Sequence, residues 1–252
     1  MPQKGSRFPL DAFRHVALDE TGSTNTEALA AARAGDPGLL WITARRQTAA
    51  RGRRGRAWTA EPGNLFATLL LLDPAPLERM ASLPLAVALA ARRAIAAVMP
   101  PGAPAVEIKW PNDILIDRKK TCGILLEAEM LPDSKRALVI GIGINVRHKP
   151  DNVAYAVTSL SEHGSSASPD DLFAHLYKEM AIVLETWNEG LGIVSVTAQW
   201  REAACGIGDR ITVNLPDRSI SGRFAGIDDK GLLMLDTGSA LMPIAAGDVF
   251  FG

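Results

Sequence analysis

Cysteine is nearly absent from this chain, since Cys122 and Cys205 are the only two among 252 residues. Two cysteines do not make the disulfide framework of a secreted protein, so the sequence predicts reduced thiols and a cytoplasmic location. No apolar run reaches the roughly 20 residues that cross a bilayer, and residues 1–10 lack the apolar core of a secretory signal. The four histidines show no metal-ligand spacing, so we assign no protein metal ligands.

Net charge is also nearly absent: 27 Lys and Arg face 28 Asp and Glu, which leaves −1. This balance argues against a general nucleic-acid binder or a membrane-surface protein. The hydrophobic fraction of 47% and the charged fraction of 22% are ordinary for a globular chain. A chain of this length can bury one core and a small appended domain, or two domains.

Against this neutral background, residues 45–58 hold six arginines and no acid. Glycines at Gly52 and Gly55 let the backbone fold closely around a ligand, and arginine grips phosphate and carboxylate through paired donors. Trp58 follows at once and can stack on a ring. The segment therefore predicts a clamp for a planar, phosphate-bearing ligand, while a solvated loop or a generic nucleic-acid contact is the alternative.

Hydrophobic periodicity and turn residues predict an α/β (α+β) chain, in which a mixed sheet is backed by helices. Strands are expected over residues 15–19, 39–44, 64–72, 106–110, 114–116, 121–130 and 137–146. Helices are expected over residues 24–34, 77–98, 172–189 and 193–204, the first beginning with the capping-box spacing of Thr24 and Glu27.

From Gly206 onward the pattern changes to short alternating strands. They are expected over residues 210–215, 219–227, 232–235 and 241–244. Such a run is typical of a small SH3-like β-barrel. We therefore expect one domain in residues 1–205 and a β domain in residues 206–252.

Two glycines, Gly141 and Gly143, lie inside an expected strand, where glycine normally weakens packing. We interpret them as a place where a ligand approaches the backbone closely, although a twisted strand without a ligand is the plainer reading. A Rossmann dinucleotide motif is excluded, because no third glycine follows and no helix opens after Gly143. Asn145, which follows this strand, offers an amide that can bind adenine.

Five segments together resemble the biotin protein ligase family in order, spacing and identity, over roughly residues 15–250. They are Ser23-Thr24-Asn25, the arginine segment, Lys109-Trp110-Pro111-Asn112-Asp113, Lys120 to Glu127, and Ile140 to Val146. The resemblance implies a class II synthetase-like biotin/lipoate ligase catalytic domain followed by an SH3-like domain.

The resemblance also implies a two-step reaction. Biotin and ATP, with Mg²⁺, give biotinyl-5′-AMP and pyrophosphate. The ε-amine of one lysine on the biotin carboxyl carrier protein of a biotin-dependent carboxylase then attacks the mixed anhydride. Because the carboxylate and the phosphate repel each other, fixed positive charge must lie between them.

By the same resemblance we assign site residues. The catalytic cations are Lys109 and Arg53. The biotin site comprises Ser23, Thr24, Asn25, Gln47, Arg51, Gly52, Arg53, Lys109 and Gly123. The nucleotide site comprises Arg53, Arg54, Arg56, Trp58, Asn112 and Asn145.

Some of these residues have simpler explanations that need no ligand. Ser23, Thr24 and Asn25 are helix-cap types, and Asn112 with Asp113 forms an ordinary turn after proline. The resemblance adds that the caps meet the ureido ring of biotin, with donors and acceptors on both sides. Further members by analogy are an apolar wall, Ile124 and Leu125; an aromatic surface, Trp58 and Trp110; and Asp113, to hold Mg²⁺ or orient Lys109.

The chain departs from the family at Ala50, where a glycine usually precedes the first arginine of the loop. If that position needs a positive φ, alanine costs about 1 kcal/mol. We also expect the loop from Arg51 to Trp58 to close over the adenylate and exclude water.

Some relatives carry an N-terminal helix-turn-helix and repress transcription. Only about 14 residues precede the first expected strand here, so we expect a monofunctional ligase without specific DNA or membrane binding. The nearest rival is a lipoate-type protein ligase, and a rival of another class is a basic-loop nucleic-acid module. Exposed strand edges allow a homodimer or pairing with the carrier domain, and the sequence does not choose between them.

Overall fold

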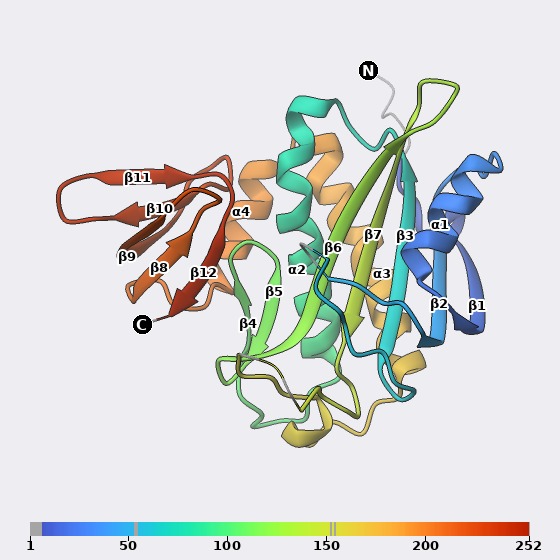
Figure 1. Ribbon diagram of the computed structural model, residues 1–252, viewed down its shortest axis with the longest axis horizontal. Helices are drawn as coiled ribbons and strands as arrows, with labels where there is room; N and C mark the ends of the chain where they lie inside the picture. Colours follow the sequence, from blue (N-terminus) through green and yellow to red (C-terminus); the bar gives the residue numbers. More distant parts are fainter. Residues whose placement is uncertain (1–6, 53–54, 152, 154, 252) are drawn as a thin grey trace.

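A seven-stranded mixed sheet organises the larger part of the chain (Figure 1). The computed structural model describes residues 7–52, 55–151, 153 and 155–251. The strand order is β1-β2-β3-β7-β6-β5-β4, with β1 parallel to β2 and all other neighbours antiparallel. The strands are β1 (Arg14–Thr21), β2 (Leu40–Gln47), β3 (Leu65–Leu72), β4 (Val106–Lys109), β5 (Asp113–Ile116), β6 (Lys119–Met130) and β7 (Arg136–Ile144). The predicted mixed sheet is confirmed.

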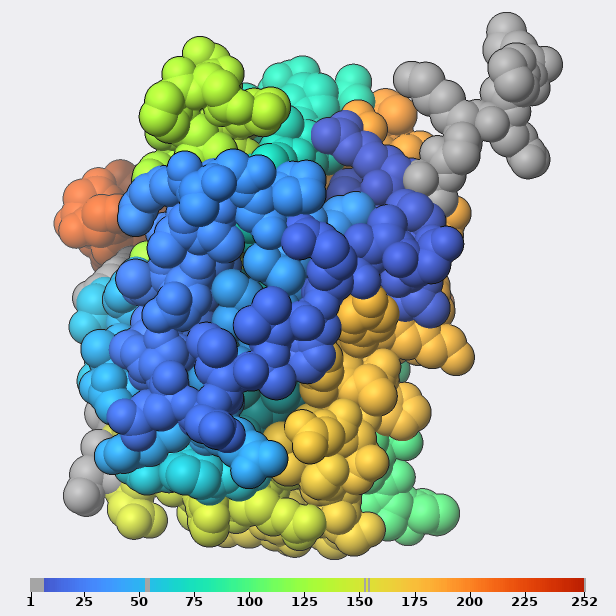
Figure 2. All heavy atoms as spheres, turned by 90° about the vertical axis from the view of Figure 1, so that its right-hand side faces the viewer, coloured from blue at the N-terminus to red at the C-terminus, as the bar shows by residue number. Residues whose placement is uncertain are grey.

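Helices cover both faces of this sheet. Helix α1 (Thr24–Arg33) packs on one face, and α2 (Leu83–Ala97) with α3 (Pro169–Trp187) packs on the other. Strand β3 is apolar on both sides: Leu70 joins the small core under α1, while Leu69 and Leu71 join the large core under α2 and α3. Seen from the side, β1, α1 and β2 form the blue surface at one edge, with α3 beside them (Figure 2).

The long helix expected over residues 77–98 is divided in two. Residues Leu77–Ser82 form a 3₁₀ helix (η3), and α2 begins only at Leu83. Pro84 in the first turn explains the break, because proline lacks a backbone N–H and suits a helix start. Residues Leu77–Ala97 are apolar enough to cross a membrane by length and composition, but 61% of the most apolar window is buried inside the molecule, as in a core helix.

The capping box predicted at Thr24 and Glu27 is wrong. The N-cap of α1 is Ser23, which makes no side-chain capping bond, and Glu27 accepts a hydrogen bond from Thr21 Oγ1 at 2.6 Å instead. A complete capping box occurs at α3, between Ser168 and Asp171. The polar side chains of the Ser23–Asn25 segment are therefore available for contacts other than capping α1. Further short 3₁₀ helices are η1 (Leu10–Ala12), η4 (Ser161–His163) and η5 (Asn188–Gly190).

After α4 (Ile193–Glu202), an antiparallel five-stranded sheet forms the C-terminal unit, as predicted for an SH3-like domain. Its order is β11-β10-β9-β8-β12. Its strands are β8 (Arg210–Asn214), β9 (Ser219–Ile227), β10 (Leu233–Asp236), β11 (Leu241–Ile244) and β12 (Asp248–Phe251). Strand β12 was not expected from the sequence.

The C-terminal sheet is held against the β4–β5 hairpin. Trp110 Nε1 donates to the carbonyl of Gly231 at 3.1 Å, and Arg118 pairs with Asp209 at 2.6 Å. The backbone N–H of Cys205 donates to the carbonyl of Ile108 at 2.9 Å. These contacts fix β12 beside the ends of β4 and β5, where a site can be built from both sheets.

Gly231 tests how tightly this contact is packed. It has a φ of +85°, and an added Cβ would overlap Leu85 Cδ1. Gly238 has a φ of +84° with no atom near such a Cβ, so Gly238→Ala isolates the backbone strain. We expect Gly231→Ala to lower the free energy of unfolding by roughly 1–3 kcal/mol more than Gly238→Ala, the usual cost of overpacking. Urea denaturation measures both, and equal losses would contradict a tight interface.

Candidate active site

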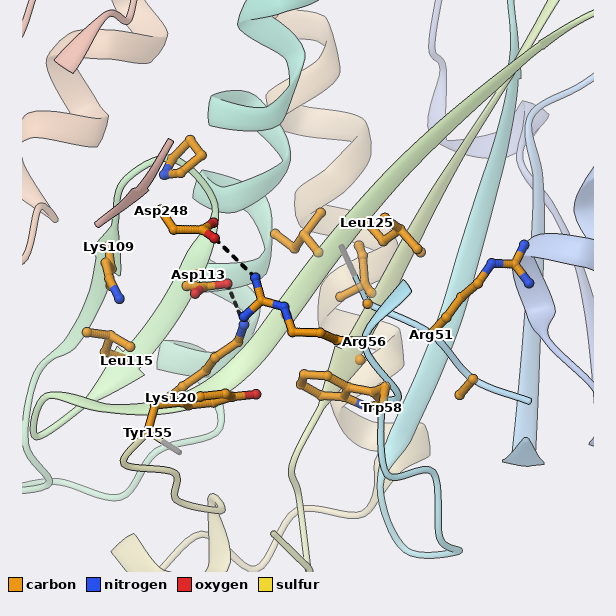
Figure 3. A pocket seen from close by; sticks show the side chains of 18 of the residues that line it. Arg51, Arg56, Trp58, Lys109, Asp113, Leu115, Lys120, Leu125, Tyr155 and Asp248 are labelled. Carbon is orange, nitrogen blue, oxygen red and sulfur yellow. Dashed lines mark hydrogen bonds and ion pairs between the residues drawn. The ribbon is translucent and has the colours of Figure 1, made fainter. Parts of the chain in front are cut away.

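A pocket of about 350 Å³ opens between the start of α1, strands β6 and β7, and strand β12 (Figure 3). Most predicted site residues meet there. Those that line it are Ser23, Thr24, Asn25, Gln47, Arg51, Gly52, Arg56, Trp58, Lys109 and Gly123.

The floor of the pocket is a glycine stripe on the sheet. Gly123 of β6 lies opposite Gly143 of β7. An added Cβ would stand 2.8 Å from Trp58 Cζ3 at Gly123 and 2.7 Å from Trp58 Nε1 at Gly143. At Gly141 it would overlap Asn25 Oδ1. The close approach predicted at Gly141 and Gly143 is thus made by protein side chains, and these glycines let Trp58 and Asn25 lie directly on the strands.

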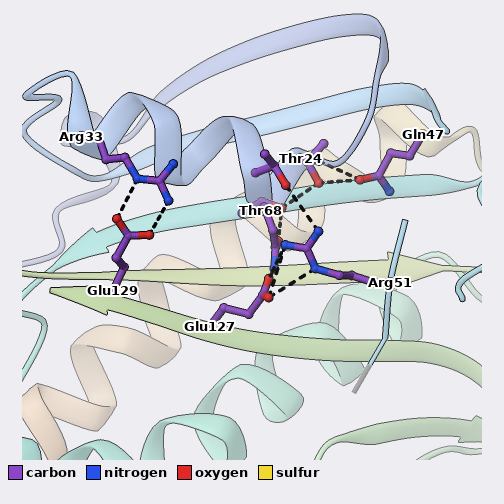
Figure 4. Close-up of polar contacts among 9 residues, drawn as sticks. Thr24, Arg33, Gln47, Arg51, Thr68, Glu127 and Glu129 are labelled. Atoms are coloured by element: carbon purple, nitrogen blue, oxygen red, sulfur yellow. Dashed lines mark hydrogen bonds and ion pairs between the residues drawn. The ribbon is translucent and has the colours of Figure 1, made fainter. Parts of the chain in front are cut away.

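A chain of hydrogen bonds runs along the α1 side of the pocket (Figure 4). Asn25 Nδ2 donates to Glu127 Oε2 at 2.7 Å, and Thr68 Oγ1 lies 2.7 Å from both Asn25 Oδ1 and Thr24 Oγ1. Gln47 Oε1 accepts from the backbone N–H of Thr24 at 2.7 Å. Thr24, Asn25 and Thr68 are buried, so their polar atoms are positioned by one another rather than by water.

The arginine segment folds back on itself over the pocket. The N–H of Gly52 donates to the carbonyl of Arg56 at 2.7 Å, and the N–H of Trp58 donates to that of Ala50 at 3.0 Å. Ala50 is not among the residues with positive φ, so the strain considered for alanine there does not arise. Gly55, at the turn, does have a φ of +69°.

Two arginines of this segment form ion pairs with carboxylates at opposite ends of the pocket. Arg51 lies 3.4 Å from Glu127 of β6, and Arg56 lies 3.2 Å from Asp248 of β12. All four side chains are partly exposed, so each pair contributes little to stability. The roles predicted for Arg53 and Arg54 lie outside the described residues and stay predictions.

Two lysines enter the pocket from the C-terminal side. Burial lowers the pKa of Lys109, partly offset by Asp113, and its Nζ lies 5.6 Å from the ring centres of Phe250 and Phe251. Lys120 Nζ lies 2.7 Å from Asp113 Oδ1 and over the rings of Trp58 and Tyr155. Lys120 was missed because its place beside Lys119 resembles a hairpin turn. It lies three residues before Gly123 in β6, within the Lys120–Glu127 segment that carries the family resemblance, and that signal could have found it.

Three predicted residues have structural partners. Asn112 Nδ2 donates to the carbonyl of Ile124 at 3.1 Å, and Asn145 Nδ2 donates to that of Thr158 at 3.1 Å. Both asparagines are buried and neither lines the pocket, so their predicted contacts to the nucleotide stay predictions. Trp110 borders the pocket but is 4% exposed, with its N–H bonded to Gly231. Of the predicted apolar wall, both Leu125 and Ile124 line the pocket, and Ile124 also packs in the large core.

Other pocket residues lie on segments that sequence reasoning did not connect. They are Leu115, Arg118, Tyr155 and the β12 residues from Asp248 to Phe251, whereas Asp113, which also lines the pocket, was named by analogy. Cys122 is wholly buried and burial raises the pKa of its thiol, so it packs in the core as a neutral thiol. Within the part of the chain that the structure describes, no three His, Cys, Asp or Glu side chains gather as a metal site.

Comparison with known proteins identifies the fold around this pocket. Residues 21–145 match the biotin/lipoate A/B protein ligase family, and residues 206–252 match the biotin protein ligase C-terminal domain. The biotin--[acetyl-CoA-carboxylase] ligase of Paracoccus denitrificans is 35% identical over 244 residues, which cover 93% of this chain and 99% of that one. The chain belongs to the biotin protein ligase family.

Solved structures of family members superpose over nearly the whole chain. The biotin protein ligase of Aquifex aeolicus in complex with biotin and ATP has a TM-score of 0.81 and 26% identity, and the match covers 95% of this chain and 98% of that one. The Leishmania major enzyme in complex with biotinyl-5-AMP has a TM-score of 0.66 and 27% identity, with coverage of 95% and 98%. The family predicted from the motifs is confirmed.

The contact of Trp58 with the glycine stripe can be tested at Gly143. In Gly143→Ala the new methyl group meets the indole, so we expect Trp58 to leave the floor and its backbone N–H to exchange with solvent faster. Gly22→Ala is the matched control, since a Cβ there meets nothing within 4 Å and its φ is not positive. Hydrogen exchange of the Trp58 amide measures the effect, and unchanged protection in Gly143→Ala would contradict this arrangement.

Burial of Lys109 gives a second test. Desolvation disfavours the charged amine, so Lys109 should lose its proton at a lower pH than an exposed lysine. Lys135 is the internal reference, because its neighbour Asp133 raises its pKa. Between the two pKa values of Lys109, folded and unfolded, the unfolded chain binds more protons, so stability rises with pH there. An NMR titration of ¹³C-labelled lysine, assigned with Lys109→Arg, should show Lys109 titrating first, and the reverse order would refute the desolvation.

Proposed function

We propose that this pocket forms biotinyl-5′-AMP and holds it for transfer to a biotin carboxyl carrier protein. The activity of the family, ATP-dependent activation of biotin and its transfer to a specific lysine, is the activity of this chain. The site assignment rests on one pocket that has an uncharged hydrogen-bonding end and a cationic end. A molecule with a polar ring, an apolar tail and a terminal carboxylate fits that order.

The biotin ring belongs at the α1 end. Thr24, Asn25 and Gln47 present fixed amide and hydroxyl groups there, beside Ser23 and the backbone of Gly123. A ureido group has both N–H donors and a carbonyl acceptor, so it needs such a mixed surface. Leu125 provides apolar surface for the tail further along the floor.

The reacting groups belong at the cationic end. A biotin carboxylate oxygen attacks the α-phosphorus of ATP, and the bond to the pyrophosphate oxygen breaks. Lys109 and Lys120 both line this end, and their charges offset the repulsion between the two anions. In the second step the uncharged carrier lysine attacks the carbonyl carbon, AMP leaves, and the amine loses a proton. We retain Arg53, Arg54, Arg56 and Trp58 as nucleotide contacts and add Lys120 to the catalytic cations.

Magnesium enters as part of the ATP substrate. Mg²⁺ usually binds through phosphates, waters and one or two carboxylates rather than through a complete protein cage. Asp113 and Asp248 are the acids that line the pocket among the described residues, so the residues present fit this mode. When bound, the ion would neutralise charge on the phosphates.

The arginine segment is proposed to close over the adenylate. Arg51 and Arg56 are held by weak, partly exposed ion pairs, and an anion between them can compete for both guanidinium groups. Closure would keep water from the mixed anhydride until the carrier arrives.

Several wider predictions stay part of this proposal. The domain boundary follows Cys205, and the protein is cytoplasmic. Its partner is a carrier protein, and it binds neither a specific DNA sequence nor a membrane. Strand β1 lies at the open edge of the sheet, where a homodimer or the carrier could pair. Biotin is favoured over lipoate because residues 206–252 match the C-terminal domain of biotin protein ligases.

The test is biotin-dependent exchange of pyrophosphate into ATP. We expect Lys109→Ala and Lys120→Ala each to lower the exchange rate by about 100-fold or more, the usual loss on removing a charge that stabilises a transition state. Lys135→Ala is the control, since Lys135 lies on the far hairpin and pairs only with Asp133 among the described residues. Exchange that is supported by lipoate and not by biotin would replace the proposed substrate, and exchange with neither acid would reject adenylate formation.

A further inference from the structure

Glu127 stands outside the site as assigned so far, yet it ends the hydrogen-bond chain that runs through the biotin end. It lies on β6, and its side chain is 30% exposed. It accepts from Asn25 Nδ2 at 2.7 Å and lies 3.4 Å from the guanidinium group of Arg51 (Figure 4). One carboxylate thus contacts a buried amide on one side and the arginine segment on the other.

The charge of Glu127 fixes which way the Asn25 amide points. An ionised carboxylate only accepts hydrogen bonds, so the atom of Asn25 that faces it must be the NH₂ group. Asn25 Oδ1 is then the atom 2.7 Å from Thr68 Oγ1, and it accepts the hydroxyl proton of Thr68. Since a hydroxyl has one proton, Thr68 has none left for Thr24.

That direction passes on to Thr24. With the Thr68 proton on Asn25, the hydroxyl proton of Thr24 has two acceptors in the protein, Thr68 Oγ1 at 2.7 Å and Gln47 Oε1 at 3.1 Å. The hydroxyl proton of Thr24 is therefore held within the protein rather than offered to a ligand. Gln47 Oε1 is already fixed as an acceptor by the backbone N–H of Thr24, so its NH₂ group is the donor at this wall.

We propose that Glu127 is a positioning residue that fixes the Asn25 amide and, through it, the hydrogen-bonding surface of the biotin end. Two donors point toward the carboxylate: Thr68 donates to Asn25, and Asn25 donates to Glu127. Without the carboxylate the Asn25 amide can turn over, which reverses its contact with Thr68 and changes the group that Asn25 presents to the pocket. The consequence for biotin rests on the proposed function, whereas the direction of the chain does not.

The same strand offers a matched control. Glu129 lies two residues further along β6, on the same face, and accepts from Arg33 Nε of α1 at 2.7 Å. It therefore shares the strand, the charge and the ion pair with an arginine, but among the described residues it contacts neither Asn25 nor the lining of the pocket. Glu129→Ala removes one carboxylate from β6 and leaves the chain intact.

The first experiment separates binding from chemistry. In pyrophosphate exchange, we expect Glu127→Ala to raise the KM for biotin by about 10- to 100-fold, as for the loss of a hydrogen bond to a charged group. The rate at saturating biotin should change much less. Glu127→Gln, whose amide oxygen can still accept from Asn25, should recover most of the affinity, and Glu129→Ala should match the unmodified protein. Equal KM values for Glu127→Ala and Glu129→Ala would overturn the proposal.

A double-mutant cycle tests whether Glu127 acts through Asn25. If it does, Glu127→Ala should add little to the KM once Asn25→Ala is present, whereas independent roles would multiply. A readout without substrate is the side-chain NH₂ signal of Asn25 in ¹⁵N NMR. Its shift and slow exchange should be lost in Glu127→Ala and kept in Glu129→Ala. An unchanged Asn25 signal in Glu127→Ala would refute the orientation of Asn25 by Glu127, whether or not the protein supports exchange with biotin. A lack of exchange with biotin in the unmodified protein would reject only the proposed function.

Discussion

The pairing of β6 with β7 is the constraint on which the site depends. One face of this pair carries Ile140, Ile142 and Ile144, which anchor it in the large core. The other face has glycines where side chains would otherwise stand, and the protein fills that space with Trp58 and Asn25. Because successive residues of a strand alternate between faces, a single segment both holds the core and opens the pocket floor.

The glycine stripe also determines what the arginine segment can do. Trp58 lies flat on Gly123 and Gly143 and anchors one end of the segment to the sheet. The arginines before it then rest on Glu127 at one end and Asp248 at the other. Since partly exposed ion pairs are weak, these contacts can orient the guanidinium groups in the empty protein without holding them against a stronger anion.

The sequence predicted the elements of the sheet and most of the pocket because those signals are local. Apolar runs, glycines in strands and the Lys109–Asp113 segment each carry their meaning within a few residues. It did not predict Tyr155 or β12, whose place in the site arises only when distant segments meet. The strand glycines were predicted to lie against a ligand, whereas the group that lies against Gly143 is Trp58. The sequence does not show which side chain will occupy the space beside a glycine. The Thr24 capping box failed for a related reason: tertiary partners for Glu27 outcompeted the local one.

The C-terminal sheet influences the proposed reaction through its contact with Lys109. The Nζ atom of Lys109 lies at equal distances from Phe250 and Phe251 of β12, and its pKa is lowered mainly by burial. Without β12 the amine would face water and behave as an ordinary lysine. Trp110, the next residue, is bonded to Gly231 of the same sheet, so the position of the amine and the docking of the domain are set together. A desolvated charge interacts more strongly with an anion than a hydrated one does, and this makes the small sheet part of the electrostatics of the pocket rather than an appendage.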